Sequence, residues 1–213
     1  MIKAVLFDMD GTILDTEPLS KLAWSTVLSE NGYSFTEKMF YEHVGLNPTS
    51  TEKLYKSYLG ENVPYYEMRK KVHLFREDYR NKYGIAVKKG FSELSCFLRE
   101  KGIVSVIATS TPKAEAEHYL TIAGIRERFD YIIGGDEITE GKPAPEIYLK
   151  AAKLAKADVS ECIAVEDSTN GIMSALNANI KCVYIHDFSD ISKELEERCV
   201  VCEDLAKIID IIS

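Results

Sequence analysis

The sequence predicts an α/β fold, with a Rossmann-like, doubly wound parallel sheet and an all-helical domain inserted near its N-terminus. Short apolar runs rich in Val and Ile occur at Lys3–Asp8, Ile103–Thr109 and Glu161–Glu166, and each ends in a polar residue. Such runs are typical of strands that are buried on both faces of a parallel sheet. Helical patterns separate the later strands, and this alternation indicates a doubly wound sheet.

Further elements continue the alternation towards the C-terminus. Two weaker strand candidates lie at Asp130–Gly134 and Lys181–Ile185. In a sheet of this kind a ligand binds at the carboxyl ends of the strands, and polar residues follow several of these strands directly. The helices predicted between the strands are Phe91–Lys101, Pro112–Ala123, Ala144–Ala155 and Asn170–Asn177.

Residues 16–83 interrupt the alternation, because they contain only helical patterns. Pro18 near the start of the first helix and Gly32 just after its end match the preferences of helix termini. We therefore expect an α/β catalytic core formed by residues 1–15 and 84–213, and a helical cap domain formed by residues 16–83. The helices predicted in this domain are Pro18–Asn31, Glu37–His43, Ser50–Leu59 and Tyr65–Tyr83.

The composition is that of an ordinary globular protein, which limits the classes of partner. The chain has 213 residues, of which 46% are hydrophobic and 28% are charged, enough for one core and a smaller domain. A net charge of −8, from 26 basic and 34 acidic residues, disfavours nucleic-acid binding, which needs clustered Lys and Arg. No apolar run approaches a membrane helix, and the N-terminal residues lack a secretory signal. We expect a cytoplasmic monomer that acts on a small molecule.

The five cysteines do not suggest a disulfide framework, because their number is odd and their spacing is scattered. Cys199 and Cys202 have the C-x-x-C spacing of redox and zinc sites. A single pair cannot fill a four-ligand zinc site. We predict a short terminal strand here.

The strongest chemical signal is the run from Asp8 to Thr12, Asp-Met-Asp-Gly-Thr, at the end of the first strand. Ionised groups near a core need a metal or another partner. Side chains two apart on an extended strand share a face, so the carboxylates of Asp8 and Asp10 could converge. Gly11 permits a tight turn close to a ligand. The simpler interpretation is a strand end followed by an Asx-type turn.

Three other clusters each have both a chemical and a simple interpretation. Thr109 and Ser110 end a strand before a predicted helix, and suit either an anion or an N-cap. Lys142 stands between Gly and Pro, and is either a fixed positive charge or an exposed loop lysine. Glu166 and Asp167 end another strand, and suit Mg²⁺, which prefers carboxylate oxygens, or are solvated loop acids.

Together the four clusters resemble the haloacid dehalogenase-like (HAD) hydrolase superfamily over essentially the whole chain. They occur in the order acid pair, hydroxyl, lysine, acid pair, with intervals of 101, 33 and 25 residues between Asp8, Thr109, Lys142 and Asp167. The resemblance is closest to the subgroup with a helical cap inserted after the first motif. That subgroup includes β-phosphoglucomutase and many small-molecule phosphatases.

The resemblance implies a role for each motif residue. Asp8 would attack phosphorus and form an aspartyl-phosphate, which divides the displacement into two easier steps. Asp10 would protonate the leaving alcohol and then deprotonate the attacking water. Lys142, the hydroxyl of Thr109 and the backbone N–H of Ser110 would hold the oxygens of the transferred group.

The resemblance also implies Mg²⁺ as the cofactor. The ion would bind a carboxylate oxygen of Asp8, the backbone carbonyl of Asp10 and a carboxylate oxygen of Asp167, so that an anionic nucleophile can approach a phosphate. Glu166 would be a further ligand, directly or through water, or would act on the site from outside the ligand set. In the cap, the loop around Gly45 and the helix carrying Lys71 are expected to contact the substrate.

Residues at the motif positions favour some reactions of the superfamily over others. Dehalogenases of the superfamily lack the second acid, and phosphonatases have Ala there, so Asp10 disfavours both. The mutase is the stronger competitor. It has a His in the first cap helix where this chain has Ser20, and a phosphate-gripping Arg where this chain has Pro48. An Arg fork to a second phosphate is not replaced by Lys.

The sequence thus predicts a Mg²⁺-dependent phosphatase that hydrolyses a small phosphorylated metabolite, such as a sugar phosphate. A phosphohexomutase is the first alternative. An inactive binding or regulatory domain is a remote alternative, and it would release no phosphate from any ester.

Overall fold

A computed structural model describes the chain except for residues 45, 47 and 187–190. The chain divides into two compact units. The α/β unit consists of Met1–Asp15 and Ile85–Ser213, and the helical unit consists of Thr16–Gly84.

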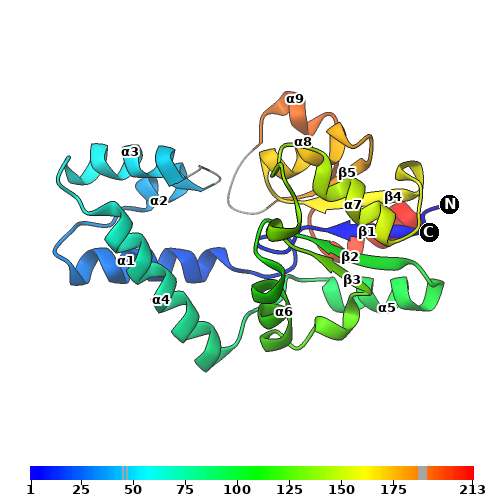
Figure 1. The fold of residues 1–213 in the computed structure, drawn as a ribbon, viewed down its shortest axis with the longest axis horizontal. Coiled ribbons are helices and arrows are strands. Elements are labelled where there is room, and N and C mark those ends of the chain that lie inside the picture. Colours follow the sequence, from blue (N-terminus) through cyan, green and yellow to red (C-terminus); the bar gives the residue numbers. More distant parts are fainter. Residues whose placement is uncertain (45, 47, 187–190) are drawn as a thin grey trace. The chain divides into compact units, whose positions relative to one another are not determined.

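The α/β unit contains one six-stranded sheet in which every neighbouring pair of strands is parallel (Figure 1). The order is β3-β2-β1-β4-β5-β6, which confirms the predicted doubly wound α/β fold. The strands are β1 (Ala4–Phe7), β2 (Val104–Ala108), β3 (Tyr131–Ile133), β4 (Cys162–Glu166), β5 (Lys181–Ile185) and β6 (Val200–Cys202).

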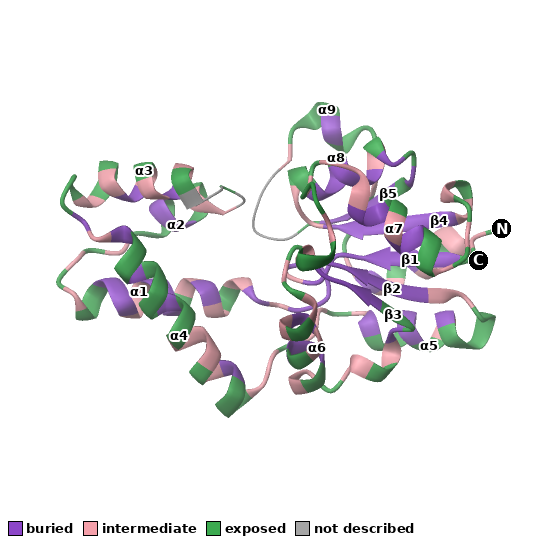
Figure 2. Cartoon of the chain, in the orientation of Figure 1, coloured by how far each residue is buried: buried purple, intermediate pink, exposed green. Residues whose placement is uncertain are grey.

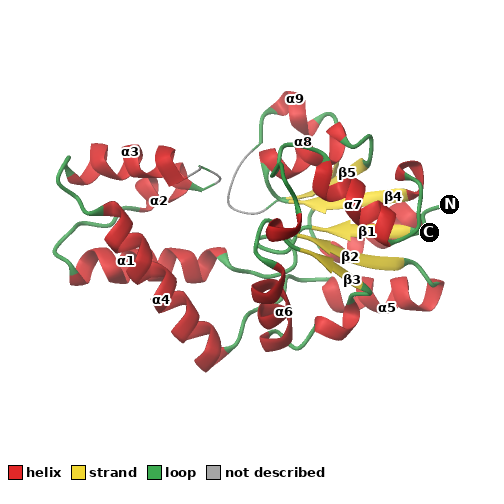
Figure 3. Ribbon diagram, viewed as in Figure 1, coloured by secondary structure: helices red, strands yellow, loops and turns green. Residues whose placement is uncertain are grey.

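Helices cover both faces of the sheet, which is why its central strands are mostly apolar (Figure 3). On one face lie α5 (Phe91–Lys101), α6 (Lys113–Ile122) and α10 (Ile208–Ile212). On the other face lie α7 (Glu146–Leu154), α8 (Thr169–Asn177) and α9 (Lys193–Glu196). Short 3₁₀ turns connect these elements at Arg126–Arg128, Gly135–Glu137, Val159–Glu161 and Leu205–Lys207.

The register of the central strands brings their carboxyl ends to one edge. Phe7, the last residue of β1, is paired with Ile107 of β2 and with Val165 of β4. Asp8 and Glu166 follow two of these positions directly, and Thr109 follows Ile107 after one further residue. These polar residues lie where the strand order reverses around β1. Ligands of doubly wound sheets bind at such a reversal. Strands β1 and β4 are buried throughout, and β2 is buried after its first residue, whereas the loops at their ends are partly exposed (Figure 2).

The helical unit has a core of its own, formed from the inner faces of its four helices. These are α1 (Glu17–Glu30), α2 (Glu37–His43), α3 (Pro48–Leu59) and α4 (Tyr65–Tyr83). Trp24 of α1 packs against Tyr55 of α3 and Tyr65 of α4, with ring centroids 4.5 Å and 5.9 Å away. The helix α3 begins at Pro48, two residues earlier than predicted, because proline is well tolerated in a first helical turn.

A short antiparallel contact closes the base of the insertion within the α/β unit. The backbone N–H of Asp15 donates to Ala86, and that of Lys88 donates to Ile13, both at 2.9 Å. An ion pair of 3.2 Å joins the side chains of Lys88 and Asp15. The two chain segments that leave and re-enter the α/β unit are therefore held side by side.

Acid should destabilise the helical unit through His43. Burial, with a smaller contribution from the positive charge of Arg76, lowers the pKa of His43 from the usual 6.5 to about 4. Below pH 6.5 the unfolded chain binds a proton that the folded unit does not, so stability falls as the pH drops from about 6.5 towards about 4. The loss is at most about 3 kcal/mol.

Fluorescence of Trp24 measures this effect. Trp24 is the single tryptophan of the chain, and its ring centroid lies 5.8 Å from that of His43. Urea titrations in steps between neutral pH and pH ~4.5 should show the loss in the wild type and much less of it in His43→Asn. Asn does not titrate, and it offers an acceptor to the Tyr55 hydroxyl that shares a 3.1 Å hydrogen bond with Nδ1 of His43. An identical pH dependence in both proteins would contradict the prediction.

Among the described residues, neither a disulfide bond nor a helix suited to span a membrane is found. All five cysteines are free thiols, and Val200–Cys202 forms the edge strand β6, as predicted for the C-x-x-C segment. No described helix combines the length and apolar content that a membrane span requires.

Candidate active site

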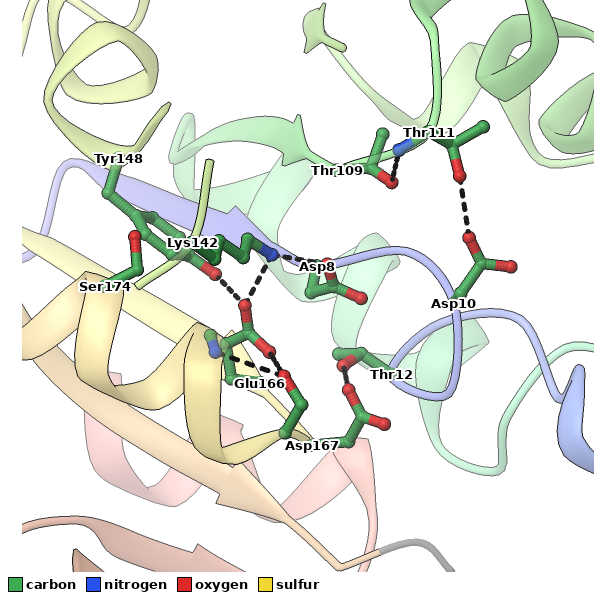
Figure 4. Close-up of polar contacts among 12 residues, drawn as sticks. Asp8, Asp10, Thr12, Thr109, Thr111, Lys142, Tyr148, Glu166, Asp167 and Ser174 are labelled. Atoms are coloured by element: carbon green, nitrogen blue, oxygen red, sulfur yellow. Dashed lines mark hydrogen bonds and ion pairs between the residues drawn. The ribbon is translucent and has the colours of Figure 1, made fainter. Parts of the chain in front are cut away.

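Asp8 is the central residue of the site, because it directly follows β1, one of the two central strands of the sheet. Its backbone N–H donates to Val165 at 2.9 Å, which extends the pairing between β1 and β4 by one residue. The side chain is buried, with 8% of the residue exposed. Its Oδ1 accepts a hydrogen bond from Nζ of Lys142 at 2.5 Å (Figure 4).

A tight turn after Asp8 leads the chain out of the sheet. Gly11 has a φ of 79°, which glycine adopts without steric cost. The N–H of Gly11 donates to Leu14, and the N–H of Leu14 donates to Met9, both at 2.9 Å. The hydroxyl of Thr12 donates to Oδ1 of Asp167 at 2.9 Å, and so joins the turn to the loop after β4.

Asp10 lies in this turn and points to a different partner from Asp8. Its Oδ2 accepts a hydrogen bond from the hydroxyl of Thr111 at 3.1 Å (Figure 4). The N–H of Thr111 in turn donates to the Thr109 hydroxyl at 3.1 Å. The prediction that Asp8 and Asp10 share one face of an extended strand is wrong, because β1 ends at Phe7.

Lys142 is held between two carboxylates. Its Nζ contacts Oδ1 of Asp8 at 2.5 Å and Oε1 of Glu166 at 2.6 Å, and only 7% of its side chain is exposed. The loop that carries it is fastened to α8, since the Ser174 hydroxyl donates to the carbonyl of Ala144 at 2.6 Å. The interpretation of Lys142 as an exposed loop lysine is therefore wrong.

Glu166 is fully buried and is surrounded by donors. Its Oε1 accepts from the hydroxyl of Tyr148 at 2.6 Å as well as from Lys142, and its Oε2 accepts from Ser168 at 3.3 Å. The carboxylate also lies against Gly171 of α8, where an added Cβ would stand 2.0 Å from it. A glycine is required there, because any side chain would displace Glu166.

Burial and charge act against each other in this cluster. Burial raises the pKa of Asp8 to about 7, although the positive charge of Lys142 opposes the rise. Burial alone would lower the pKa of Lys142, but the carboxylates of Asp8 and Glu166 reverse this and raise it above its usual value. The pKa of Tyr148 is also raised, first by burial and then by the charge of Glu166, so its hydroxyl remains a donor.

Carboxylate oxygens of Asp8, Glu166 and Asp167 lie within 4.8 Å of one another. Within the described part of the chain, this is the only group of three or more His, Cys, Asp or Glu side chains close enough to hold a metal ion. An all-oxygen donor set fits Mg²⁺, which binds through one or two carboxylates and keeps several waters. Oε1 of Glu166 already accepts hydrogen bonds from Lys142 and Tyr148.

Three residues that the sequence predicted to bind phosphate or substrate remain: Ser110, Lys71 and Gly45. Ser110 is exposed directly after Thr109, at the carboxyl end of β2. Lys71 is exposed on α4, and its amine donates to Oδ1 of Asn31 at 2.5 Å. Gly45 lies outside the described residues.

The structure adds two residues that were not predicted from the sequence, Tyr148 and Thr111. Tyr148 lies on the buried face of α7, where a tyrosine is easily read as core. A buried tyrosine hydroxyl needs a hydrogen-bond partner. That requirement is the one feature of the sequence that could have pointed to a polar contact of Tyr148. Thr111 follows the selected pair Thr109 and Ser110 immediately, but nothing in the sequence distinguishes its hydroxyl from theirs.

Comparison with known proteins agrees with this arrangement of strand-end residues. Residues 5–185 match the family described as haloacid dehalogenase-like hydrolase. The chain belongs to the haloacid dehalogenase-like hydrolase family. The match confirms the resemblance predicted from Asp8, Thr109, Lys142 and Asp167.

Relatives of this HAD-like chain match it over almost its full length. A phosphorylated carbohydrates phosphatase of Thermotoga maritima is 29% identical and is covered over 98% of its length, with 99% of this chain aligned. The validoxylamine A 7'-phosphate phosphatase of Streptomyces hygroscopicus subsp. limoneus is 28% identical, with 98% of this chain and 96% of that protein aligned.

A solved structure shows the same fold. A Thermotoga maritima protein that carries the provisional name of β-phosphoglucomutase superposes with a TM-score of 0.82, at 28% identity, over 99% of this chain and 98% of that one. The similarity includes both units of the HAD-like chain.

Proposed function

We propose that this HAD-like enzyme is a Mg²⁺-dependent phosphatase that hydrolyses a small phosphorylated metabolite, of the sugar phosphate class, through an aspartyl-phosphate on Asp8. The observation that supports the proposal most strongly is the position of Lys142, which bridges Asp8 and the buried Glu166 at the strand ends. A fixed cation beside a carboxylate nucleophile suits an anionic substrate. The neighbouring Asp167 completes a set of oxygen ligands for a metal.

The class of enzyme rests on the family and its members. The chain belongs to a hydrolase family, and the two relatives described above are named as phosphatases of phosphorylated carbohydrates and of a 7'-phosphate. The chain is a phosphoric monoester hydrolase. Its substrate within that class is part of our proposal.

In the proposed first step, a carboxylate oxygen of Asp8 attacks phosphorus. A bond forms between that oxygen and phosphorus while the ester P–O bond breaks, and the leaving oxygen takes a proton from the carboxyl group of Asp10. In the second step Asp10 accepts a proton from water, and the water oxygen attacks phosphorus. Inorganic phosphate leaves and Asp8 is restored. The Thr111 hydroxyl, at 3.1 Å, fixes the carboxylate of Asp10 for both transfers.

Mg²⁺, when bound by Asp8, Asp167 and the backbone carbonyl of Asp10, would supply positive charge that reduces the repulsion between nucleophile and phosphate. Lys142 contributes a second positive charge to the oxygens that are transferred. The hydroxyl of Thr109 and the N–H of Ser110 are proposed as further donors. Glu166 holds the amine of Lys142 in place.

Two residues of the helical unit support a phosphatase rather than a mutase. Ser20 is 7% exposed within α1, and it occupies the position of the mutase histidine. Pro48 begins α3 and stands where the mutase has an arginine for a second phosphate. The structural similarity to the protein provisionally named β-phosphoglucomutase makes the mutase the alternative that an assay has to exclude.

Phosphate release from a panel of phosphorylated metabolites tests the function. We expect release from at least one sugar phosphate with Mg²⁺, and loss of that activity with excess EDTA, restored by added Mg²⁺. Any phosphate released by an Asp8→Asn protein that is purified in the same way measures the activity of contaminating phosphatases. Conversion of β-glucose 1-phosphate to glucose 6-phosphate without free phosphate, given a trace of the bisphosphate, would instead establish the mutase. No reaction with any ester would contradict both.

A further inference from the structure

Two cysteines meet at the edge of the sheet, where the chain enters β6 beside β5. Val200 of β6 is paired with Val183 of β5 in parallel register. The residues one position earlier, Cys199 and Cys182, are therefore neighbours across the same two chain segments. Neighbouring strands lie about 4.8 Å apart, and a disulfide needs Cα atoms that are about 4.4–6.8 Å apart. The backbone thus holds these two cysteines at a spacing that a disulfide can bridge.

The side chains of these two cysteines lie on the same face of the sheet. Cys182 belongs to the hydrophobic cluster that α7 and α8 cover, and Cys199 packs against that cluster. Their thiols are hydrogen-bonded to each other. Cys202 belongs to the cluster on the opposite face, because residues an odd number of positions apart in a strand point to opposite sides. The C-x-x-C spacing therefore separates Cys199 from Cys202, and the sheet pairs Cys199 with Cys182 instead.

Metal binding does not account for this pair of thiols. A structural zinc site needs four ligands, drawn from Cys, His and acidic side chains. Within the part of the chain that the structure describes, the only group of three or more such side chains lies at Asp8, in the candidate active site. Packing alone does not require a thiol at either position, because other small apolar side chains fill such space equally well. Oxidation is the chemistry that needs both thiols.

The two thiols differ in the properties that decide which one reacts first. Cys182 is fully buried, whereas Cys199 is partly exposed to solvent. The hydrogen bond from Cys182, together with the positive charge of Arg198, lowers the pKa of Cys199. The same hydrogen bond and burial raise the pKa of Cys182. Since the thiolate is the nucleophile, Cys199 is suited to attack an oxidant and Cys182 to complete the disulfide.

We propose that Cys182 and Cys199 form a site of reversible oxidation, at which a hydroperoxide converts the two thiols into a disulfide. The thiolate sulfur of Cys199 attacks a peroxide oxygen, so that an S–O bond forms and the O–O bond breaks. The leaving oxygen takes up the proton that the Cys199 thiol has lost, and Cys199 becomes a sulfenic acid. The Cys182 sulfur then attacks the Cys199 sulfur, and an S–S bond replaces the S–O bond. The hydroxide that leaves takes the Cys182 proton and becomes water.

The disulfide fastens an edge strand to the sheet. β6 has three residues, and β5 is its only neighbour in the sheet. The two cysteines are 17 positions apart in the chain, and a cross-link over such a distance stabilises a protein by restricting its unfolded state. We expect the Tm of the full-length protein to be higher by about 4 °C or more after oxidation. Dithiothreitol should return the Tm to its starting value.

Peptide mass spectrometry tests which thiols are joined. Full-length protein is reduced, freed of reductant, treated with hydrogen peroxide, alkylated with N-ethylmaleimide and digested with trypsin. Cleavage after Lys181 and Arg198 places Cys182 and Cys199 in separate peptides, whereas Cys199 and Cys202 share one peptide. We expect a cross-linked pair of peptides that joins Cys182 to Cys199, both in the wild type and in Cys202→Ala. A disulfide within the peptide of Cys199 and Cys202, or oxidation to sulfinic acid without a disulfide, or alkylation of all five cysteines, would overturn the proposal.

Variants assign the change in Tm to this pair. Cys182→Ala and Cys199→Ser should each lose the cross-link and the rise in Tm on oxidation, whereas Cys162→Ala should keep both. Cys162 is the matched control, because it is buried on the same face but lies two positions from Ala164, the residue paired with Cys182. Its thiol donates to the carbonyl of Asp158 at 3.3 Å. A rise in Tm that persists in Cys182→Ala, or that is lost in a folded Cys162→Ala protein, would overturn the proposal.

Trapping of the sulfenic acid tests the order of the two steps. Dimedone, which reacts with sulfenic acids, is added together with hydrogen peroxide. In Cys182→Ala the thiol that completes the disulfide is missing, so we expect dimedone on Cys199. In Cys199→Ser we expect at least tenfold less dimedone on Cys182. Trapping on Cys182 in Cys199→Ser to the same extent as on Cys199 in Cys182→Ala, or no trapping on Cys199 at all, would overturn the proposed reaction.

Discussion

Replacement of Asp8 by Asn is expected to reduce phosphate release by at least about 10⁴-fold, because the amide cannot act as a nucleophile towards phosphorus. The fold should survive the change. Asn has nearly the shape of Asp, and Lys142 keeps its 2.6 Å contact with Glu166. Burial already raises the pKa of Asp8 to about 7, so removal of this charge does not remove a strongly stabilising one.

The measurement is steady-state phosphate release with the best ester from the substrate panel, together with thermal unfolding of both proteins. The matched control is Asp210→Asn, which changes an exposed acid on α10 and should leave kcat/KM within twofold. Acid-quenched wild-type enzyme should also carry labelled phosphate from the substrate, and Asp8→Asn should carry none. Activity within tenfold of the wild type in a folded Asp8→Asn protein would show that another group attacks phosphorus.

Replacement of Lys142 by Met should lower both activity and stability. Without the amine, the buried carboxylates of Asp8 and Glu166 lose their shared partner. Removal of one partner from a buried ionic cluster typically costs about 3–5 kcal/mol in the free energy of unfolding. We expect a loss of this size in urea titrations, and at least about 10²-fold lower kcat, because a positive charge on the transferred oxygens is missing.

A second substitution separates the two effects. Lys142→Met combined with Glu166→Gln removes one of the uncompensated carboxylates, while the amide oxygen still accepts from the Tyr148 hydroxyl, 2.6 Å from the carboxylate in the native chain. The double variant should therefore be more stable than Lys142→Met alone, yet equally inactive. If the double variant is no more stable than Lys142→Met, the stability of the cluster does not depend on charge balance.

The strands could be predicted from the sequence because their residues carry the signal locally. Ala4–Phe7 is an unbroken apolar run, and all of its residues are buried. A residue at the end of such a run lies at the carboxyl end of the strands. This rule identified Asp8 and the Glu166–Asp167 pair. The order of the strands could not be read in this way. It depends on which strands pair with β1 on each side, and no local pattern records that.

The partners of the site residues were harder to predict than the residues themselves. Tyr148 and Gly171 lie on buried helix faces, where sequence patterns indicate packing, and their contact with Glu166 arises only from the way α7 and α8 meet β4. The contacts of Lys71 and Arg69 could not be predicted from the sequence either. Both are basic residues of α4, and only the tertiary structure shows that Arg69 lines a cavity of the helical unit whereas the amine of Lys71 contacts Asn31. The roles of Gly45 and Lys71 in substrate binding stay predictions.

The antiparallel contact of Asp15 with Ala86, and of Ile13 with Lys88, has a consequence for how this chain can diversify. The two ends of the insertion are already held together by these contacts. The length of residues 16–84 should therefore have little effect on the stability of the α/β unit. Loop-closure entropy changes only slowly with loop length, by about 0.6 kcal/mol for each doubling. Deletions, insertions and wholesale exchange between these anchor points should therefore be tolerated. Substrate preference can then drift while the reaction chemistry is inherited unchanged.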